Sequence, residues 1–262
     1  DFTPNKRVKI INNIYINRIT KGIYELGSVF KTFTLAAALD EDLIKVDTKF
    51  LNLEKSINCG KNIIREYDNK IPKDLTAEEI LIRSGNIGSV RIGQKLGIEK
   101  FKSFLTKINV INKIEFDIEE VGTPIPFNWG KCKLATTSFG HGITTTPLQL
   151  AKGYAIISNG GFEVKPTIIK DKNEKFIKYK KRLVKTNVSK EINPILRKIV
   201  TNKEGTASLA NVAGYEIGGK TGTAEKIVSG KYSSKKKINT FVSIFPISDP
   251  KYVLVVILDE PQ

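Results

Sequence analysis

An almost continuous apolar run, YELGSVFKTFTLAAALD at residues 24–40, gives this chain its clearest structural signal. A helix that is apolar on every side is buried on every side, so the run predicts a core helix from Ser28 to about Leu43. Lys31 lies inside it, three residues after Ser28. Buried lysines are rare unless another group pairs with them. The run therefore predicts the centre of the fold, and it also raises the question of what Lys31 does there.

Helix signals continue through the middle of the chain. Thr76 and Glu79 have the spacing of a capping box, which predicts a short helix ending at Arg83. A later helix is expected to have Thr145 as its N-cap and Pro147 in its first turn, and to end at Gly160-Gly161. The other expected helices cover 88–96, 99–107 and about 190–201, the last of which contains Pro194.

The last third of the chain has strand patterns. Strands are expected at 162–169, 176–179, 215–224, 239–246 and 252–259. Asp249-Pro250 predicts the turn between the last two of these strands. Helices first and an antiparallel run last indicate an α+β fold, with helices packed on an antiparallel sheet.

The formal net charge of +16 raises the question of a nucleic-acid partner. Lysines are spread along the whole chain and arginine, the preferred residue for contacts to bases and phosphates, is scarce. The only tight basic run, Lys235-Lys236-Lys237, is expected in a loop rich in Ser, Gly and Lys. We therefore expect no nucleic-acid partner and a solvated lysine-rich surface, with attraction to an anionic membrane or cell-wall polymer as the alternative.

The two cysteines, Cys59 and Cys132, are too few and too far apart for a zinc site, and the sequence leaves open whether they are thiols or a disulfide. No run of 18 apolar residues is present, so no segment is expected to span a membrane, and no signal peptide is visible. The abrupt start at residues 1–4 suggests a fragment, whose anchor would lie outside it.

Three short stretches carry candidate chemistry: SVFK at 28–31, SGN at 84–86 and KTGT at 220–223. Each is weak alone, because Ser-x-x-Lys is frequent by chance in a lysine-rich chain and Ser-Gly-Asn is a common turn composition. Together and in this order they form the triple found in penicillin-binding proteins and class A β-lactamases. Their conjunction predicts a serine acyl-transfer site.

The chemistry of that site explains the choice of residues. A serine hydroxyl is a poor nucleophile until a neighbour takes its proton, and Lys31 lies on the same helix face as Ser28. A free lysine is protonated at pH 7, but burial and a second ammonium, for which Lys220 is the candidate, both lower its pKa. Ser28 is therefore the predicted nucleophile and Lys31 its predicted base. Ser84 would carry the proton to the leaving amine, and Asn86 would hold Lys31 and bind the substrate amide.

The KTGT stretch has a separate role. On an edge strand its backbone can pair with an extended peptide, and Gly222 would leave room where a substrate backbone presses close. Thr221 and Thr223 offer hydroxyls to a terminal carboxylate, with Lys220 adding charge. The N–H groups of Ser28 and Thr223 could form an oxyanion hole. The only histidine, His141, is expected to be structural in a glycine-flanked turn, which argues against a Ser-His-Asp triad.

These motifs, together with SFGHGITTTPLQLA and FPISDPKYVLVVILDEPQ, resemble the transpeptidase domain of class B penicillin-binding proteins. The resemblance is greatest to the division-specific (FtsI-type) peptidoglycan D,D-transpeptidases and covers essentially residues 1–262. It implies the penicillin-binding or serine β-lactamase-like transpeptidase fold, and Ser28, Lys31, Ser84, Asn86 and Lys220–Thr223 in the roles above. It also implies no metal or cofactor.

The resemblance further implies a partner set and a location. The donor would be a peptidoglycan stem peptide ending in D-Ala-D-Ala, and β-lactams would acylate Ser28 as donor mimics. The family is anchored in the bacterial inner membrane with this domain in the periplasm, and it meets divisome membrane proteins. Its membrane helix, pedestal domain, N-terminal hairpin and C-terminal helix have no counterpart in this sequence. We therefore expect a domain truncated at both ends, with an incomplete sheet and a bare apolar edge at 252–259.

Two alternative functions remain open at the level of sequence. A serine β-lactamase or D,D-carboxypeptidase would use the same scaffold, and a β-lactamase needs a second base to hydrolyse the acyl-enzyme. Glu115, Glu119 and Glu120 lie in a region that the sequence does not place. A β-lactam sensor or a non-catalytic binding domain would keep the same pocket without crosslinking.

Overall fold

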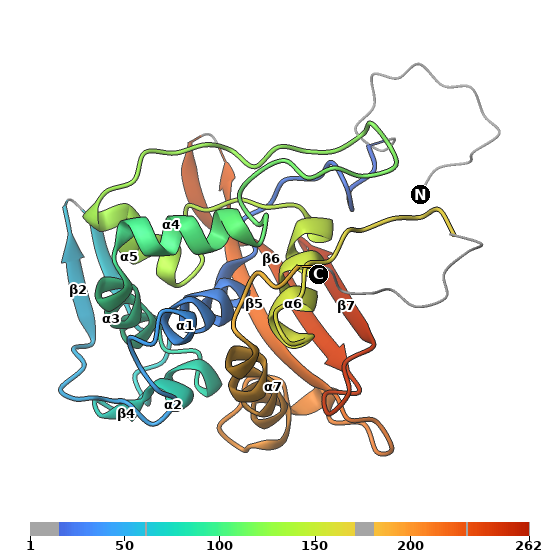
Figure 1. Cartoon of the computed structure of the whole chain (residues 1–262). Helices are drawn as coiled ribbons and strands as arrows, with labels where there is room; N and C mark the ends of the chain where they lie inside the picture. The colour runs from blue at the N-terminus through green and yellow to red at the C-terminus, as the bar shows by residue number, and fades with distance from the viewer. Residues whose placement is uncertain (1–15, 61, 171–180, 229, 262) are drawn as a thin grey trace.

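The computed structural model describes residues 16–60, 62–170, 181–228 and 230–261. An antiparallel sheet forms one side of the molecule, and a group of helices forms the other (Figure 1). The sheet has the order β5 (Gly218–Val228), β6 (Lys231–Phe245) and β7 (Tyr252–Asp259). Helices α6 (Pro147–Ser158) and α7 (Thr186–Thr201) pack on the sheet. The α+β class with helices on an antiparallel sheet is therefore confirmed.

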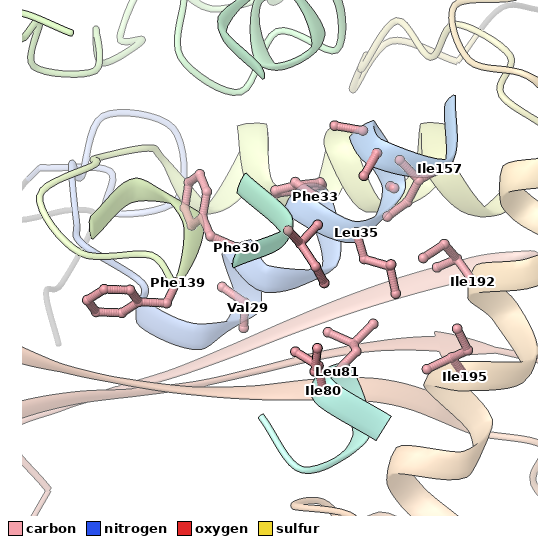
Figure 2. Packing of buried hydrophobic residues seen from close by; sticks show 14 of the residues in the cluster. Val29, Phe30, Phe33, Leu35, Ile80, Leu81, Phe139, Ile157, Ile192 and Ile195 are labelled. Atoms are coloured by element: carbon pink, nitrogen blue, oxygen red, sulfur yellow. The ribbon is translucent and has the colours of Figure 1, made fainter. Parts of the chain in front are cut away.

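The apolar run forms the centre of the core, as predicted. A 3₁₀ turn, η2 (Gly27–Phe30), leads into α1 (Lys31–Asp40), and all residues of α1 are buried. Figure 2 shows Phe33 and Leu35 among apolar side chains from α2 (Ala77–Ile82), α6 and α7. The helix stops at Asp40 rather than near Leu43 because Asp42 adopts a left-handed φ of 53°.

The remaining helices lie around α1. They are α3 (Asn86–Leu96), α4 (Ile98–Lys107) and α5 (Lys131–Ser138), with a short 3₁₀ turn, η3 (Ser208–Ala210), before β5. The capping box is present at the start of α2, where Thr76 and Glu79 each accept a backbone N–H of the other. The expected 88–96 helix begins two residues earlier, because the Glu66 carboxylate accepts the N–H groups of Asn86 and Ile87.

Two corrections concern the ends of the sheet-facing helices. Thr146, not Thr145, is the N-cap of α6, with Pro147 as its first residue. The backbone of Thr145 instead pairs with that of Tyr24. Helix α7 contains Pro194 as expected but begins at Thr186, because the backbone N–H of Lys185 donates to Asp40 at the end of α1.

The strand predictions were partly wrong. Strand β7 has the predicted bounds, whereas residues 162–169 form only a single bridge, between Phe162 and Arg182. The expected strand at 176–179 lies outside the described residues. The Lys235–Lys237 run lies in β6 rather than in a loop, at a β-bulge where the register between β5 and β6 shifts. The connection at 246–251, which contains Asp249-Pro250, joins β6 to β7 as predicted.

Two small two-stranded sheets complete the helical side. β1 (Lys49–Phe50) pairs with β4 (Leu75–Thr76), and β2 (Ser56–Cys59) pairs with β3 (Asn62–Arg65). A disulfide joins Cys59 at the end of β2 to Cys132 in α5, which settles the question that the sequence left open. The disulfide connects segments 73 residues apart and ties the β2–β3 hairpin to the helices.

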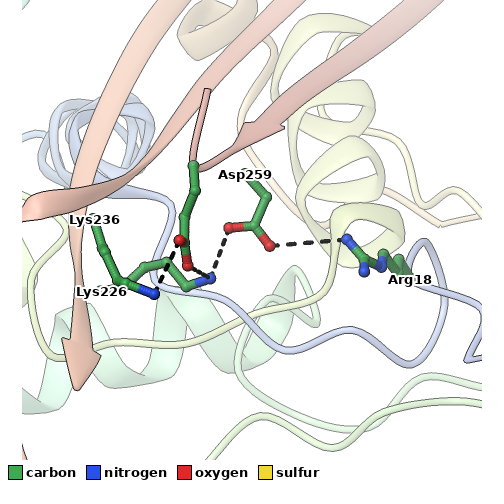
Figure 3. A network of polar contacts seen from close by, with 5 residues as sticks. Arg18, Lys226, Lys236 and Asp259 are labelled. Atoms are coloured by element: carbon green, nitrogen blue, oxygen red, sulfur yellow. Dashed lines mark hydrogen bonds and ion pairs between the residues drawn. The ribbon is translucent and has the colours of Figure 1, made fainter. Parts of the chain in front are cut away.

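Strand β7 is an edge strand in the described part of the chain, where the sheet has three strands. One of its faces contacts α6, and the other carries a row of exposed apolar side chains: Tyr252, Leu254, Val256 and Leu258. At the end of β7, Asp259 and Glu260 both form ion pairs with Lys226 (Figure 3). Arg18 also pairs with Asp259, and Lys236 with Glu260. The expected incomplete sheet with an apolar edge strand fits these described residues.

Candidate active site

Ser28 lies on the 3₁₀ turn η2, in front of the core helix. The backbone N–H of Lys31 donates to the carbonyl of Ser28. In a 3₁₀ turn the side chains at positions i and i+3 eclipse each other, so Ser28 and Lys31 lie on one face. Ser28 is half-buried and reaches solvent, whereas Lys31 is only 1% exposed. The turn thus offers a hydroxyl to the surface with a buried amine behind it.

The Lys31 amine is held by three acceptors from one short segment. It donates to the Ser84 carbonyl at 2.5 Å, to the Ser84 hydroxyl at 3.2 Å and to Asn86 Oδ1 at 2.7 Å. Burial lowers the pKa of Lys31 from its ordinary value to about 7, against the opposing charge of Glu66. A lysine in this setting is substantially neutral near pH 7, which is the state a base needs.

Lys220 reaches the same point from β5. Its amine donates to the Ser84 hydroxyl at 2.8 Å and to the Thr221 carbonyl at 3.1 Å, and its side chain is fully buried. Burial, and after it the positive charge of Lys31, hold the pKa of Lys220 well below its ordinary value. The positive charge of Lys220 was expected to lower the pKa of Lys31. Burial is instead the cause that lowers the pKa of Lys31, and the repulsion between the two amines acts on the pKa of Lys220.

Ser84 and Asn86 lie at the junction of α2 and α3. Ser84 is buried and adopts a left-handed φ of 57°, a conformation that costs free energy in a residue other than glycine. This turn aims the Ser84 carbonyl and hydroxyl at Lys31, while Asn86 opens α3 with its side chain toward the same amine. The predicted turn is present: the Ser84 side chain is hydrogen-bonded to both lysines, and the Asn86 side chain to Lys31.

The KTGT stretch lies on β5, which is an edge strand of the sheet that the described residues form, as predicted. Gly222 has a role within the fold that the sequence did not reveal. A Cβ on Gly222 would lie 2.3 Å from the Leu26 carbonyl oxygen, so the glycine makes room for the backbone at the start of η2, and its expected contact with a substrate stays a prediction. Gly140 makes room in the same way, because its Cβ would meet the Gly27 carbonyl oxygen at 1.9 Å. Main chain therefore packs on main chain beneath Ser28.

The threonines of β5 face the cleft, with their hydroxyls in contact with neighbours. Thr221 shares a hydrogen bond of 2.6 Å with the Thr206 hydroxyl, and Thr223 donates to Asn239 Oδ1 at 3.2 Å. Lys220, the residue before Thr221 on β5, points into the core instead. Its amine is therefore buried under Ser84, and the expectation that it adds charge for a carboxylate beside Thr221 and Thr223 stays a prediction.

A cleft of about 480 Å³ opens above these groups. Six of the eight predicted site residues line its surface: Ser28, Ser84, Asn86, Thr221, Gly222 and Thr223. The other two, Lys31 and Lys220, lie under Ser84. The lining that the sequence did not predict comes from Tyr67, Phe139, His141, Thr206, Glu225 and Lys237.

His141 is in a glycine-flanked turn, as expected, but that turn forms a wall of the cleft. Gly140 and Gly142 both have positive φ, and the imidazole packs between Phe139 and Tyr232. Tyr232 in turn donates to the Glu25 carboxylate at 3.2 Å. Burial lowers the pKa of His141, so the ring is neutral at pH 7. The sequence signal that could have placed His141 at the cleft was its position in the SFGHGI segment, which belongs to one of the motifs of the resemblance.

Within the described residues, no group of three or more His, Cys, Asp or Glu side chains could hold a metal ion. None of the described helices combines the length and apolar character needed to cross a membrane. The region that the sequence left unplaced includes Glu120, which binds the N–H of Asn17 and pairs with Lys21. Among the described lining residues of the Ser28 cleft, the one carboxylate is Glu225.

Comparison with known proteins gives one consistent result. The family model "Penicillin binding protein transpeptidase domain" matches residues 1–262. A curated relative from Caulobacter vibrioides, "Probable peptidoglycan D,D-transpeptidase FtsI", is 28% identical over all of this chain and 45% of its own length. The chain thus spans less than half the length of that relative.

Solved structures agree with the family match. The transpeptidase domain of penicillin-binding protein 3 from Burkholderia pseudomallei superposes with a TM-score of 0.86 at 28% identity, covering 94% of this chain and 74% of that one. A Mycobacterium penicillin-binding protein 3 in complex with ampicillin has a TM-score of 0.82 at 25% identity, covering 94% of this chain and 58% of that one.

Proposed function

Because the chain belongs to the penicillin-binding protein transpeptidase family, we propose that it is a serine D,D-transpeptidase that crosslinks peptidoglycan stem peptides. One observation carries the proposal. Two buried amines, from Lys31 and Lys220, converge on the Ser84 hydroxyl directly beneath the cleft that Ser28 lines. Such an arrangement lowers the cost of removing a proton from a nearby hydroxyl, which is what a serine nucleophile requires.

Acylation follows from these groups. The Ser28 Oγ attacks the carbonyl between the two terminal D-alanines, and neutral Lys31 accepts its proton. The N–H groups of Ser28 and Thr223 stabilise the tetrahedral oxyanion. The C–N bond then breaks, and Ser84, hydrogen-bonded to both lysines, passes a proton to the departing D-alanine amine. An ester between Ser28 and the shortened stem peptide remains.

The second half of the reaction, in which the acyl group leaves Ser28, reverses the proton transfers. An amine from a neighbouring stem peptide attacks the ester, and Ser84 and Lys31 take up the proton that this amine loses. The C–O bond to Ser28 breaks, and the proton returns to its oxygen. A new peptide crosslink leaves the cleft. No metal or cofactor is needed for this sequence of steps.

Substrate recognition is assigned to the edge of β5. A stem peptide in an extended form can add to this edge as a further strand, with Thr221 and Thr223 beside its terminal carboxylate. β-Lactams present a strained amide at the position of the donor carbonyl and would acylate Ser28 in the same way. Asn86 would hold the donor amide while it also binds Lys31.

The biological setting is proposed from the family. The name of the Caulobacter relative favours a role in septal wall synthesis, in a protein anchored in the bacterial inner membrane with this domain in the periplasm. Divisome membrane proteins are its expected partners, and they would meet parts of the protein other than this domain. Residues 1–262 would then be one domain of a longer chain.

The test begins with a fluorescent penicillin. We expect a stable adduct whose mass corresponds to one acylation and whose mapped position is Ser28. Ser28→Ala should abolish the adduct while leaving the thermal melt unchanged. Rapid loss of the adduct with hydrolysed drug would instead indicate a β-lactamase, and an adduct on another residue would overturn the proposed site.

A second measurement separates a transpeptidase from a sensor. Lipid-linked peptidoglycan, supplied after polymerisation by a separate glycosyltransferase, should give crosslinked muropeptides with the wild-type protein and none with Ser28→Ala. A stable penicillin adduct without crosslinks would favour a sensor or non-catalytic domain. Release of D-alanine without crosslinks would favour a carboxypeptidase.

A further inference from the structure

We propose that Glu66 is a positioning residue for acyl transfer, which holds the start of α3, and through it Asn86, against the Lys31 amine. The inference rests on the proposed function, since it assigns Glu66 a role in the acylation of Ser28. Glu66 follows directly after β3 and is half-buried. It does not belong to the SVFK, SGN or KTGT stretches, and it is 20 residues from Asn86 in sequence.

The first observation is that Glu66 caps α3 from a distance. Gly85, the N-cap of this helix, has no side chain that could accept a hydrogen bond. The Glu66 carboxylate takes over this function, accepting the N–H of Asn86 at 2.7 Å and that of Ile87 at 2.8 Å. The backbone N–H of Glu66 is itself fixed by the Lys55 carbonyl at 3.1 Å. A carboxylate bonded to two amides at a helix start also gains from the helix dipole.

The second observation is that the same segment orients the Asn86 side chain. Asn86 Nδ2 donates to the Arg65 carbonyl at 2.8 Å, so its Oδ1 faces the Lys31 amine at 2.7 Å. Residues 65 and 66 therefore hold both the backbone and the side chain of Asn86. Loss of the Glu66 carboxylate would free the first turn of α3, and Asn86 would no longer present its oxygen to Lys31 in one fixed position.

The third observation concerns charge. Glu66 is the carboxylate that acts on Lys31, and its charge raises the pKa of Lys31 against the larger effect of burial. The other charged or titratable groups near this amine are Lys220, on β5, and His141, whose own pKa the charge of Lys31 lowers. The pKa of the neighbouring Tyr67 is raised by burial, then by the charge of Asp68 and after it by that of Glu66. Glu66 is thus placed to affect both the geometry and the protonation of the base.

The experiment compares Glu66→Gln, Glu66→Asp and Glu54→Gln. Each rate constant for acylation by a fluorescent penicillin is measured from pH 5.5 to 9, alongside the thermal melt at each pH. Glu54→Gln is the matched control, because Glu54 forms an exposed ion pair with Arg91, which lies on α3 as Asn86 does. It changes the charge equally without touching Asn86 or Lys31.

Glu66→Gln should lower the plateau rate about tenfold, because the amide cannot accept two N–H groups as a carboxylate does. Its pH midpoint should move to lower pH by roughly half a unit, because the charge that raises the pKa of Lys31 is gone. Glu66→Asp should keep the midpoint but lose plateau rate, since its carboxylate is one methylene short. A residue that only stabilises the fold would move the melt and not the midpoint.

Two results would overturn the inference while leaving the proposed function intact. One is a Glu66→Gln profile that matches both the wild type and Glu54→Gln. The other is a fall in rate without any change of midpoint, accompanied by a lower melt. If Glu66→Gln does not fold, the Glu66→Asp profile decides, and wild-type rate and midpoint there would count against the inference. Failure of the wild type to acylate at Ser28 would instead refute the proposed function.

Discussion

Lys31 poses the sharpest question at the residue scale, because an amine this deeply buried is costly unless its charge is lost or matched. Its three hydrogen bonds go to two uncharged residues, Ser84 and Asn86, and the neighbouring Lys220 offers no negative charge. Burial therefore dominates the balance and lowers the pKa of Lys31 to about 7. The neutral amine is the form that the proposed mechanism requires of the base for Ser28.

The acylation rate should consequently depend on pH. It should rise with pH through a midpoint near 7, because only the fraction of Lys31 that is neutral acts as base. Lys31→Arg should lower the rate at pH 7.5 by about a hundredfold or more, since a guanidinium stays protonated. Stopped-flow labelling with a fluorescent penicillin measures both effects. Lys152→Arg, at another buried lysine outside the cleft, should leave them unchanged.

Gly140 should tolerate no side chain. Its φ is +91°, and a Cβ there would lie 1.9 Å from the Gly27 carbonyl oxygen, so the turn that carries Ser28 would have to move. We expect Gly140→Ala to destabilise the fold by roughly 2 kcal/mol or more and to slow acylation. Gly214→Ala is the control, because its φ is similar, at +83°, but its Cβ would meet nothing within 4 Å. Equal melts for the two variants would contradict the steric argument.

At the scale of single elements, helix starts show which local signals are reliable. The Thr76–Glu79 capping box was predictable because both partners lie within one turn. Thr145 was the wrong cap by one residue, since TTTPLQ offers three threonines in a row. Pro147 as the first helical residue makes Thr146 the N-cap, and Thr145 is occupied elsewhere, its hydroxyl donating to the Val110 carbonyl at 2.7 Å.

Removing the α2 cap should have a measurable cost. Thr76→Ala deletes the hydroxyl that accepts the Glu79 N–H at 3.2 Å and should destabilise the fold by about 1 kcal/mol. For a chain of this size that corresponds to a fall in melting temperature of about 2–4 °C. Differential scanning fluorimetry detects such a shift. Thr106→Ala, at an exposed position within α4, should leave the temperature the same or slightly higher.

Elements whose bounds depend on distant partners could not be predicted. Helix α3 begins at Asn86 because Glu66 accepts its first N–H groups, and α7 begins at Thr186 because Asp40 binds the Lys185 N–H. No pattern within either helix records these contacts. The apolar spacing at 162–169 also favours a strand, yet the segment finds only one bridging partner, Arg182.

In the candidate site, too, the residues in short local motifs were predictable and those brought in by distant contacts were not. Ser28, Lys31, Ser84, Asn86 and KTGT were predictable because each stretch is short and their order is informative. The walls were not, since Tyr67 and Thr206 reach the cleft from loops without a motif. The reason for Gly222 was also hidden, because only the fold reveals that the Leu26 carbonyl lies beside it.

For the molecule as a whole, the Cys59–Cys132 disulfide is the one covalent link between distant segments that the described residues contain. It closes a loop of 73 residues, for which chain entropy gives roughly 4 kcal/mol as an upper value. The double variant Cys59→Ser/Cys132→Ser should therefore melt at a lower temperature than the oxidised wild type. Dithiothreitol should bring the wild type to the melting temperature of the variant and leave the variant unaffected. Equal melts without reductant would mean that the link adds no stability.

The contact of main chain with main chain beneath Ser28 has a consequence for how this protein can change over generations. Codon changes replace side chains but leave the peptide backbone in place, so the floor formed around Gly27, Gly140 and Gly222 offers few tolerable variants. At Tyr67 and Thr206 it is the side chains that line the cleft. Substitutions would accordingly accumulate in these walls, while the floor beneath Ser28 is inherited unaltered.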